Sequence, residues 1–231
     1  MTHGTVMITI ISIVLTVSIY AASIRVRARY RSPLFGPVVL SAPVIMLIIT
    51  LTPIHITGYE HAIKIITYFL GPATVALAVP FYRNRHVLFT NVVPMVVSLV
   101  AGTLASIVGA ILLGRVLGLP ASIEAALSLK TATAPVAVAL APRVGANPTL
   151  VAGLVVLYAL IVTFIGPRLL TALRIRGAVA RGSALGGVGS GQGVAEALTE
   201  GEATGASAVV SMVLAALVVT MIAPPVVHLL I

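Results

Sequence analysis

The sequence SLKTATAPVAVALAP, residues 128–142, decides how this chain is organised. It places one cation, Lys130, and the hydroxyls of Ser128, Thr131 and Thr133 in a stretch that is otherwise apolar, and Pro135 interrupts helix hydrogen bonding there. Hydrocarbon cannot solvate such groups, so at membrane depth they must face protein, an aqueous cavity or a bound ion. We interpret the stretch as half of a substrate site in a transporter-like membrane protein.

The composition predicts an integral membrane protein. Of the 231 residues, 59% are hydrophobic and only 8% are charged, whereas soluble domains carry roughly 25% charged residues. Cysteine and aspartate are both absent, which excludes disulfides, thiol metal sites and Asp-based chemistry. The histidines are scattered without ligand spacing, so we predict neither a metal nor a cofactor. A nucleophile–base–acid set is not apparent, and we do not expect an enzyme.

The positive charge of the chain indicates membrane orientation rather than nucleic-acid binding. Fourteen Lys and Arg against five Glu give a net charge of +9, and the cations cluster between apolar runs. The densest cluster, Arg25 to Arg31, is predicted to be cytoplasmic, which places the N-terminus outside.

Apolar runs predict about six full spans plus two broken or re-entrant segments. The full spans are expected at residues 4–23, 33–52, 62–82, 87–113, 149–173 and 207–231. Gly71 and Pro72 interrupt the third span, where Thr74 offers a hydroxyl. A full crossing at 122–143 would put a later arginine cluster outside, so we predict that this segment is a re-entrant hairpin.

The second broken segment is expected at residues 182–201, which are too polar and glycine-rich for a lipid-facing span. Within it, Gly186 to Gly193 holds five glycines. This loop is interpreted as a backbone site for a carboxylate or ion, or alternatively as a close helix crossing. The candidate contacts are Gly189, Ser190 and Gln192, the candidate breaks are Gly187, Gly191 and Gly193, and the candidate coupling carboxylate is Glu196.

These segments predict one all-α polytopic membrane domain over residues 1–231, with N-terminal helices in 1–120. Residues 121–231 then read as two inverted repeats, each a polar broken hairpin followed by a long helix. Inverted repeats that meet at discontinuous helices are a recurrent architecture of secondary transporters.

Three motifs carry a resemblance to a known family: LGPATVALAVPFY at 70–82, KTATAPVA at 130–137 and ARGSALG at 180–186. Together they resemble the LrgB/CidB family, which includes antiholin-like bacterial proteins and the membrane half of the plastid glycolate/glycerate translocator. Two positions depart from the family pattern. The proline before the lysine is Leu129 here, and the loop that carries a characteristic histidine reads Gly189-Ser190-Gly191.

The resemblance implies a bacterial inner-membrane protein, homo-oligomeric, with a small LrgA/CidA-type membrane partner. It implies either a carrier of small carboxylates such as glycolate, glycerate or pyruvate, or a modulator of murein hydrolase activity and autolysis. For a carrier, Lys130 would be the counter-charge of the carboxylate, aided by Thr131 and Thr133. The alternative is that Lys130 pairs with Glu124 or snorkels to an interface.

Overall fold

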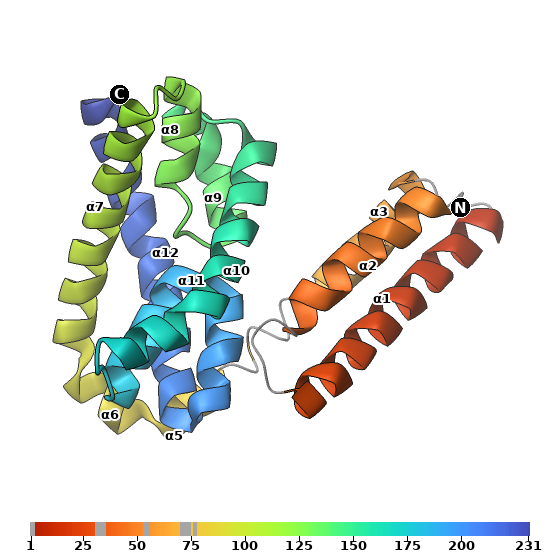
Figure 1. Cartoon of the computed structure of the whole chain (residues 1–231), viewed down its shortest axis with the longest axis horizontal. Helices are drawn as coiled ribbons and strands as arrows, with labels where there is room; N and C mark the ends of the chain where they lie inside the picture. The colour runs from red at the N-terminus through yellow and green to blue at the C-terminus, as the bar shows by residue number, and fades with distance from the viewer. Residues whose placement is uncertain (1–2, 31–35, 53–55, 70–74, 76–77) are drawn as a thin grey trace. The chain divides into compact units, whose positions relative to one another are not determined.

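The computed structural model describes residues 3–30, 36–52, 56–69, 75 and 78–231 (Figure 1). Within these ranges every regular element is a helix, which confirms the all-α prediction. In the same ranges four helices are long and apolar enough to cross a bilayer. They are α1 (His3–Tyr30), α7 (Val92–Val116), α10 (Pro148–Ala172) and α12 (Glu202–Leu230).

The first of two compact units covers residues 1–76. Its long helix α1 packs against both α2 (Pro37–Leu51) and α3 (Ile56–Tyr68). A hydrogen bond of 3.0 Å joins the Thr16 hydroxyl of α1 to the Tyr59 hydroxyl of α3. This bond gives two hydroxyl groups a partner where the helices pack.

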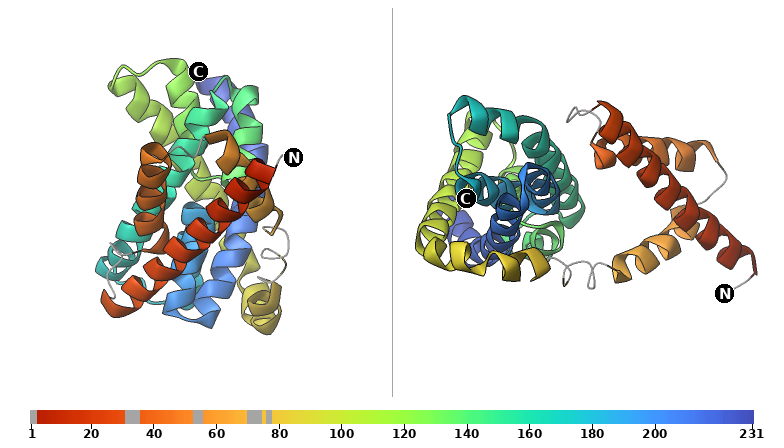
Figure 2. Two further views of the ribbon diagram at one scale, coloured as in Figure 1. Left: turned by 90° about the vertical axis from the view of Figure 1, so that its right-hand side faces the viewer. Right: turned by 90° about the horizontal axis from the view of Figure 1, so that it is seen from below.

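The second compact unit, residues 77–231, is built around α12. Seen from below in Figure 2, α12 is surrounded by other helices of this unit. It contacts α7, α11, α9 and the short α5 (Ala78–Arg83). Its side chains Val219 and Ala223 have no exposed surface. The other short helix, α6 (Arg85–Thr90), leads into α7 at the same end of the unit.

Helices α8 (Ala121–Ser128) and α9 (Ala134–Leu140) form a helical hairpin that is interrupted at residues 129–133. In Figure 1, α8 runs inward from the end of the unit where α7 finishes, and α9 returns to that end, where α10 begins. The 3₁₀ turn η2 (Ala141–Val144) follows α9 and packs against α8, as a hairpin requires. Pro135 lies in the first turn of α9, so the interruption precedes the proline, which suits a helix start.

Helix α11 (Ala178–Glu200) is a second hairpin, because its backbone is not helical at Ser190. In a straight helix Arg181 and Glu200, 19 positions apart, would be about 28 Å from each other. Instead they form a two-pronged ion pair, with Nε–Oε2 at 2.7 Å and Nη2–Oε1 at 2.6 Å. The first arm, before Ser190, and the second arm, after it, therefore lie side by side.

Glycines let the two arms of α11 pack closely on each other and on α12. A Cβ at Gly186 would meet backbone atoms of Ala208 in α12, and one at Gly193 would meet the Leu185 carbonyl of the opposite arm. The irregular glycine loop expected over residues 186–193 is thus helical apart from Ser190. The alternative interpretation, a close helix crossing, describes these positions.

The predicted third span, residues 62–82, differs from the structure at its start. Helix α3 begins at Ile56, six residues before the predicted start of this span, so Glu60 and His61 belong to the helix. It ends at Tyr68, and α5 begins at Ala78. The predicted breaks at Gly71 and Pro72, with the Thr74 hydroxyl, lie outside the described residues.

Helix α2 is shorter than expected. It has 15 residues, whereas a transmembrane helix needs about 20. Four of the six expected spans therefore reach full length in the described part of the chain, namely those matched by α1, α7, α10 and α12. Each of these helices also extends beyond the predicted range at one end at least. The prediction followed the apolar run, and a helix can continue into polar residues at its ends.

Candidate functional site

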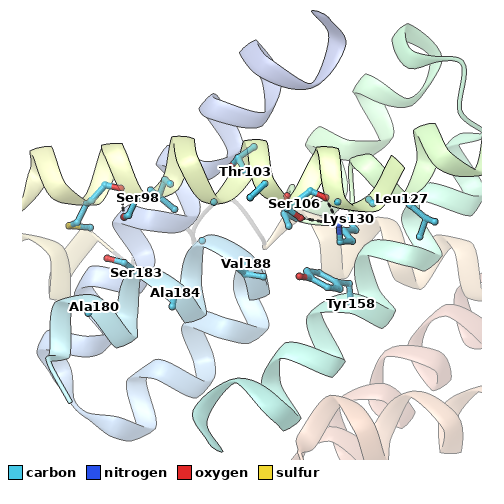
Figure 3. Close-up of a pocket in the computed structure, with 18 of the residues that line it drawn as sticks. Ser98, Thr103, Ser106, Leu127, Lys130, Tyr158, Ala180, Ser183, Ala184 and Val188 are labelled. Carbon is cyan, nitrogen blue, oxygen red and sulfur yellow. Dashed lines mark hydrogen bonds between the residues drawn. The ribbon is translucent and has the colours of Figure 1, made fainter. Parts of the chain in front are cut away.

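A groove of about 1180 Å³ runs along one face of α7 in the second unit. Facing α7 across it are the end of α8, Tyr158 of α10 and the first arm of α11. Figure 3 shows part of the lining. The lining positions on α7 include Ser98, Gly102, Ala105, Ser106 and Gly109, which recur at helical spacing and so share one face.

Lys130 projects into this groove from the interruption between α8 and α9. Its ammonium donates hydrogen bonds to Ser106 on α7, to the carbonyl oxygen at 3.0 Å and to the hydroxyl at 2.9 Å. It also lies 5.5 Å from the centre of the Tyr158 ring, a cation–π arrangement (Figure 3). An ammonium has three N–H donors, so these contacts leave one donor for a further acceptor.

The cation of Lys130 makes no ion pair within the described part of the chain. The expected alternative partner, Glu124, is instead 3.8 Å from Arg115, near the end of α7. A lysine away from water is costly unless its charge is compensated. The groove therefore presents an uncompensated positive charge.

Two buried hydroxyls in the groove have no hydrogen-bond partner among the described residues. They are the hydroxyls of Thr131, next to Lys130, and of Ser183, in the first arm of α11. Both side chains are more than nine-tenths buried. An unsatisfied buried polar group costs about 1–3 kcal/mol, so such groups in a groove point to a solute or to water that satisfies them.

The tips of the two hairpins touch. The Ser190 hydroxyl, at the tip of α11, donates to the carbonyl oxygen of Ala132 in the first hairpin at 3.3 Å. Ser190 has φ 51° and ψ −143°, a conformation that residues other than glycine rarely adopt. This contact brings residue 132 of the first hairpin next to residue 190 of the second.

Of the predicted contacts, Lys130 and Thr131 line the groove. Thr133 is the N-cap position of α9, and Gly189 and Gln192 flank Ser190 at the tip of α11. The groove lining does not include these three residues. Their role as ligand contacts stays a prediction.

The predicted coupling carboxylate and the predicted breaks also have defined places. Glu196 is buried in the second arm of α11. Gly191 adjoins the interruption at Ser190, whereas Gly187 and Gly193 lie within helical arms. A Cβ at Gly187 would meet the Leu99 side chain of α7, so this glycine brings α7 and α11 together.

Sequence reasoning missed Ser106, Tyr158 and Ser183, which complete the groove around Lys130 and Thr131. A single hydroxyl in an apolar helix gives no sign of its direction, because Ser commonly bonds to its own helix. Among the described residues no cluster of His, Cys, Asp or Glu could hold a metal ion.

The fold and the groove define a polytopic helical membrane protein with two helical hairpins that meet tip to tip, and with a groove that holds Lys130. Comparison with known sequences places it more closely. The model of the LrgB-like family matches residues 16–229, so the chain belongs to the LrgB-like family.

Relatives from Bacillus subtilis (strain 168) cover most of the chain. It is 30% identical to the uncharacterized protein YxaC, over 96% of both chains, and 30% identical to the uncharacterized protein YwbG, over 93% of this chain and 96% of that one. It is 29% identical to the antiholin-like protein LrgB over 74% of each chain. No solved structure matches. The relatives named LrgB are bacterial, which agrees with a cytoplasmic-membrane protein.

Proposed function

We propose that this chain is a membrane carrier of a small organic anion such as glycolate, glycerate or pyruvate, and that it works by alternating access. The carboxylate of the solute contacts the free N–H of Lys130 and the hydroxyl of Thr131. No covalent chemistry takes part, so the chain is not an enzyme.

The observation that carries this proposal is the uncompensated ammonium of Lys130 in a groove. Ser106 and Tyr158 orient it without neutralising it, because a carbonyl, a hydroxyl and an aromatic ring carry no formal charge. A carboxylate supplies both the missing negative charge and an acceptor for the remaining N–H. The unpartnered hydroxyl of Thr131 is a donor for its second oxygen.

The arrangement of the hairpins supports alternating access. One repeat is α8–α9 followed by α10, and the other is the hairpin α11 followed by α12. We propose that the hairpins are re-entrant, enter the membrane from opposite sides and meet near its midplane, as in inverted-repeat transporters. Movement of one hairpin against the other would then expose Lys130 to one side of the membrane at a time.

Glu196 is the proposed coupling group in this mechanism. It is a buried carboxylate six residues beyond the Ser190 tip, on an arm that would move with the second hairpin. A carboxylate in such a place can carry a proton or a cation together with the solute.

Uptake of radiolabelled glycolate and pyruvate into proteoliposomes tests the proposal. Lys130→Gln removes the charge and leaves a flexible, uncharged polar side chain that is one atom shorter. It should lower uptake at least thirty-fold, which corresponds to about 2 kcal/mol of lost charge pairing. Arg143→Gln is the matched control, because this arginine is exposed on η2, outside the groove, and should transport normally. Normal transport by Lys130→Gln, or no carboxylate uptake by the unaltered protein, would refute the proposal.

A second candidate function is favoured by the relatives, and their names support it more directly than they support transport. Several are named antiholin-like protein LrgB. Under this reading the chain regulates murein hydrolase activity and autolysis, as a homo-oligomer together with a small LrgA/CidA-type membrane protein. A regulator of this kind needs no anion site, so Lys130→Gln should leave its effect on lysis intact. Lysis rates of cells that express either form separate the two candidates.

A further inference from the structure

The groove extends well beyond Lys130. Its volume is about 1180 Å³, whereas an acid of two or three carbons occupies only roughly 100 Å³, on the scale of about 30 Å³ per water molecule. The cavity therefore has room well beyond the Lys130 site. The residues that line the rest of the groove decide in which direction a small anion can move from Lys130.

The two directions away from Lys130 differ in chemistry. Toward the end of α7, the lining is dominated by leucines, at positions 113, 117, 119 and 127. Toward the start of α7, the lining includes the hydroxyl residues Ser98, Thr103 and Ser183 (Figure 3), together with apolar side chains such as Met95 and Leu99. A hydrated anion avoids an apolar wall and gains from hydroxyl donors, so the hydroxyl-lined direction is the one it can follow.

A second polar position lies at the far end of that hydroxyl-lined direction. In Figure 3, Ser183 of α11 and Ser98 of α7 lie at one end of the drawn lining, with Ser106 and Lys130 toward the other. Ser98 and Ser106 are eight residues apart on α7, or about 12 Å. The Ser98 hydroxyl donates to the Met95 carbonyl, whereas the Ser183 hydroxyl has no partner among the described residues.

We infer that Ser183 is a second station for the transported anion, at the Ser98 end of the groove rather than at the Ser106 end where Lys130 binds, and that the anion moves between the two along the α7 face containing Gly102. The inference rests on the proposed function. Its occupant is a small hydrophilic anion whose carboxylate oxygens accept from the Ser183 hydroxyl. A hydrogen bond to a charged group is among the stronger ones, so one donor suffices for a transient site.

The alternative explanation of Ser183 is that helix packing alone leaves its hydroxyl without a partner. The chain contains a second buried serine that allows a comparison. Ser211 on α12 is also fully buried and also without a partner in the described part of the chain, but it does not line the groove. If both hydroxyls are mere packing defects, alanine at either position should be neutral or stabilising and should leave transport unchanged.

Gly102 offers an independent way to interrupt the path. It lies on α7 between Ser98 and Ser106, and a Cβ there has no described atom within 4 Å, so a larger side chain would enter the groove. Gly153 on α10 has an equally open Cβ position and does not line the groove. Gly102→Leu and Gly153→Leu thus compare the same change inside and outside the path.

The experiment measures two quantities on the full chain: equilibrium binding of labelled glycolate in nanodiscs, and its uptake rate in proteoliposomes. We expect Ser183→Ala to bind glycolate within two-fold of the unaltered protein, because Lys130 is untouched, while uptake falls about ten-fold. Gly102→Leu should show the same separation with a larger loss of uptake. Ser211→Ala and Gly153→Leu should match the unaltered protein in both measurements.

The possible outcomes separate this inference from the proposed function. If binding depends on Lys130 but Ser183→Ala and Gly102→Leu transport at the normal rate, the second station is wrong and the carrier proposal stands. If no binding depends on Lys130, the carrier proposal fails and the inference fails with it. Equal losses in Ser183→Ala and Ser211→Ala would assign the effect to packing and also overturn the inference.

Discussion

The close approach of α11 to α12 makes a quantitative prediction at Gly186. In Gly186→Ala the new Cβ would meet the carbonyl oxygen, carbonyl carbon and Cα of Ala208. All three are backbone atoms, which cannot rotate away, so the two helices must separate. Overpacking usually costs about 1–3 kcal/mol and occasionally more. Because the clash at Gly186 is with backbone, we expect a cost of about 3–5 kcal/mol. Alanine is more favourable than glycine within a helix by about 1 kcal/mol, so the net destabilisation should be about 2–4 kcal/mol.

Thermal unfolding of the detergent-solubilised protein, followed by circular dichroism at one scan rate, measures this effect. The apparent Tm of Gly186→Ala should fall by about 5–15 °C. Gly153→Ala is the control, because Gly153 lies within α10, in its second turn, and a Cβ there meets no described atom within 4 Å. Its Tm should stay equal or rise slightly. A Gly186→Ala protein as stable as the unaltered one would show that α11 and α12 do not approach as described.

Three further predictions concern the hairpins. A double-mutant cycle of Arg181→Gln and Glu200→Gln should give a coupling free energy of about 1–3 kcal/mol in denaturation. The reason is that the ion pair is two-pronged and its side chains are only 14% and 20% exposed. A coupling near zero would contradict the pairing of the two arms of α11. Ser190→Ala should be less stable than Ser190→Gly by about 1–2 kcal/mol. Both variants lose the hydrogen bond at the tip, but the backbone at position 190 is strained for alanine and not for glycine. The reverse order of Tm values would count against that strain. Leu117 and Thr149 flank the first hairpin, and the chain has no cysteine of its own. Leu117→Cys and Thr149→Cys should react with an impermeant maleimide from the same side of the membrane. Labelling from opposite sides would show that α8–α9 crosses the membrane.

The sequence was most informative where polarity and hydrophobicity conflict. Lys130 and its neighbouring hydroxyls cannot face lipid, and that single constraint predicted an interruption where α8 ends. The distribution of arginines predicted that the same segment returns rather than crosses. The structure has a helical hairpin there, and its return to the same side of the membrane stays a prediction.

The glycine-rich segment could not be interpreted correctly from composition. Glycine serves both irregular backbone and close helix contact, and the sequence is the same in either case. Only the neighbours decide: Gly186 faces Ala208 and Gly193 faces Leu185, so both are needed for packing. The non-helical residue in the segment is a serine, Ser190, which no propensity argument would have selected.

The groove was predictable only in part, for a related reason. Lys130 stands out in any apolar stretch, but its partners Ser106 and Tyr158 come from α7 and α10, far away in the sequence. One hydroxyl or one tyrosine in a long apolar helix does not reveal which way it points. Positions that depend on how three helices rotate against each other need the tertiary structure.

The contact between the hairpin tips also bears on how the protein is made. Ala132 and Ser190 are 58 residues apart, so at about 5–20 residues per second the second tip leaves the ribosome about 3–12 s after the first. During that interval the first hairpin, with Lys130 at its interruption, has no opposite hairpin to meet. Lys130 and the open backbone around it must then be held by water or by the insertion machinery. Biogenesis of the membrane domain is therefore completed late, when residues 178–230 have been inserted and both polar tips can be buried together.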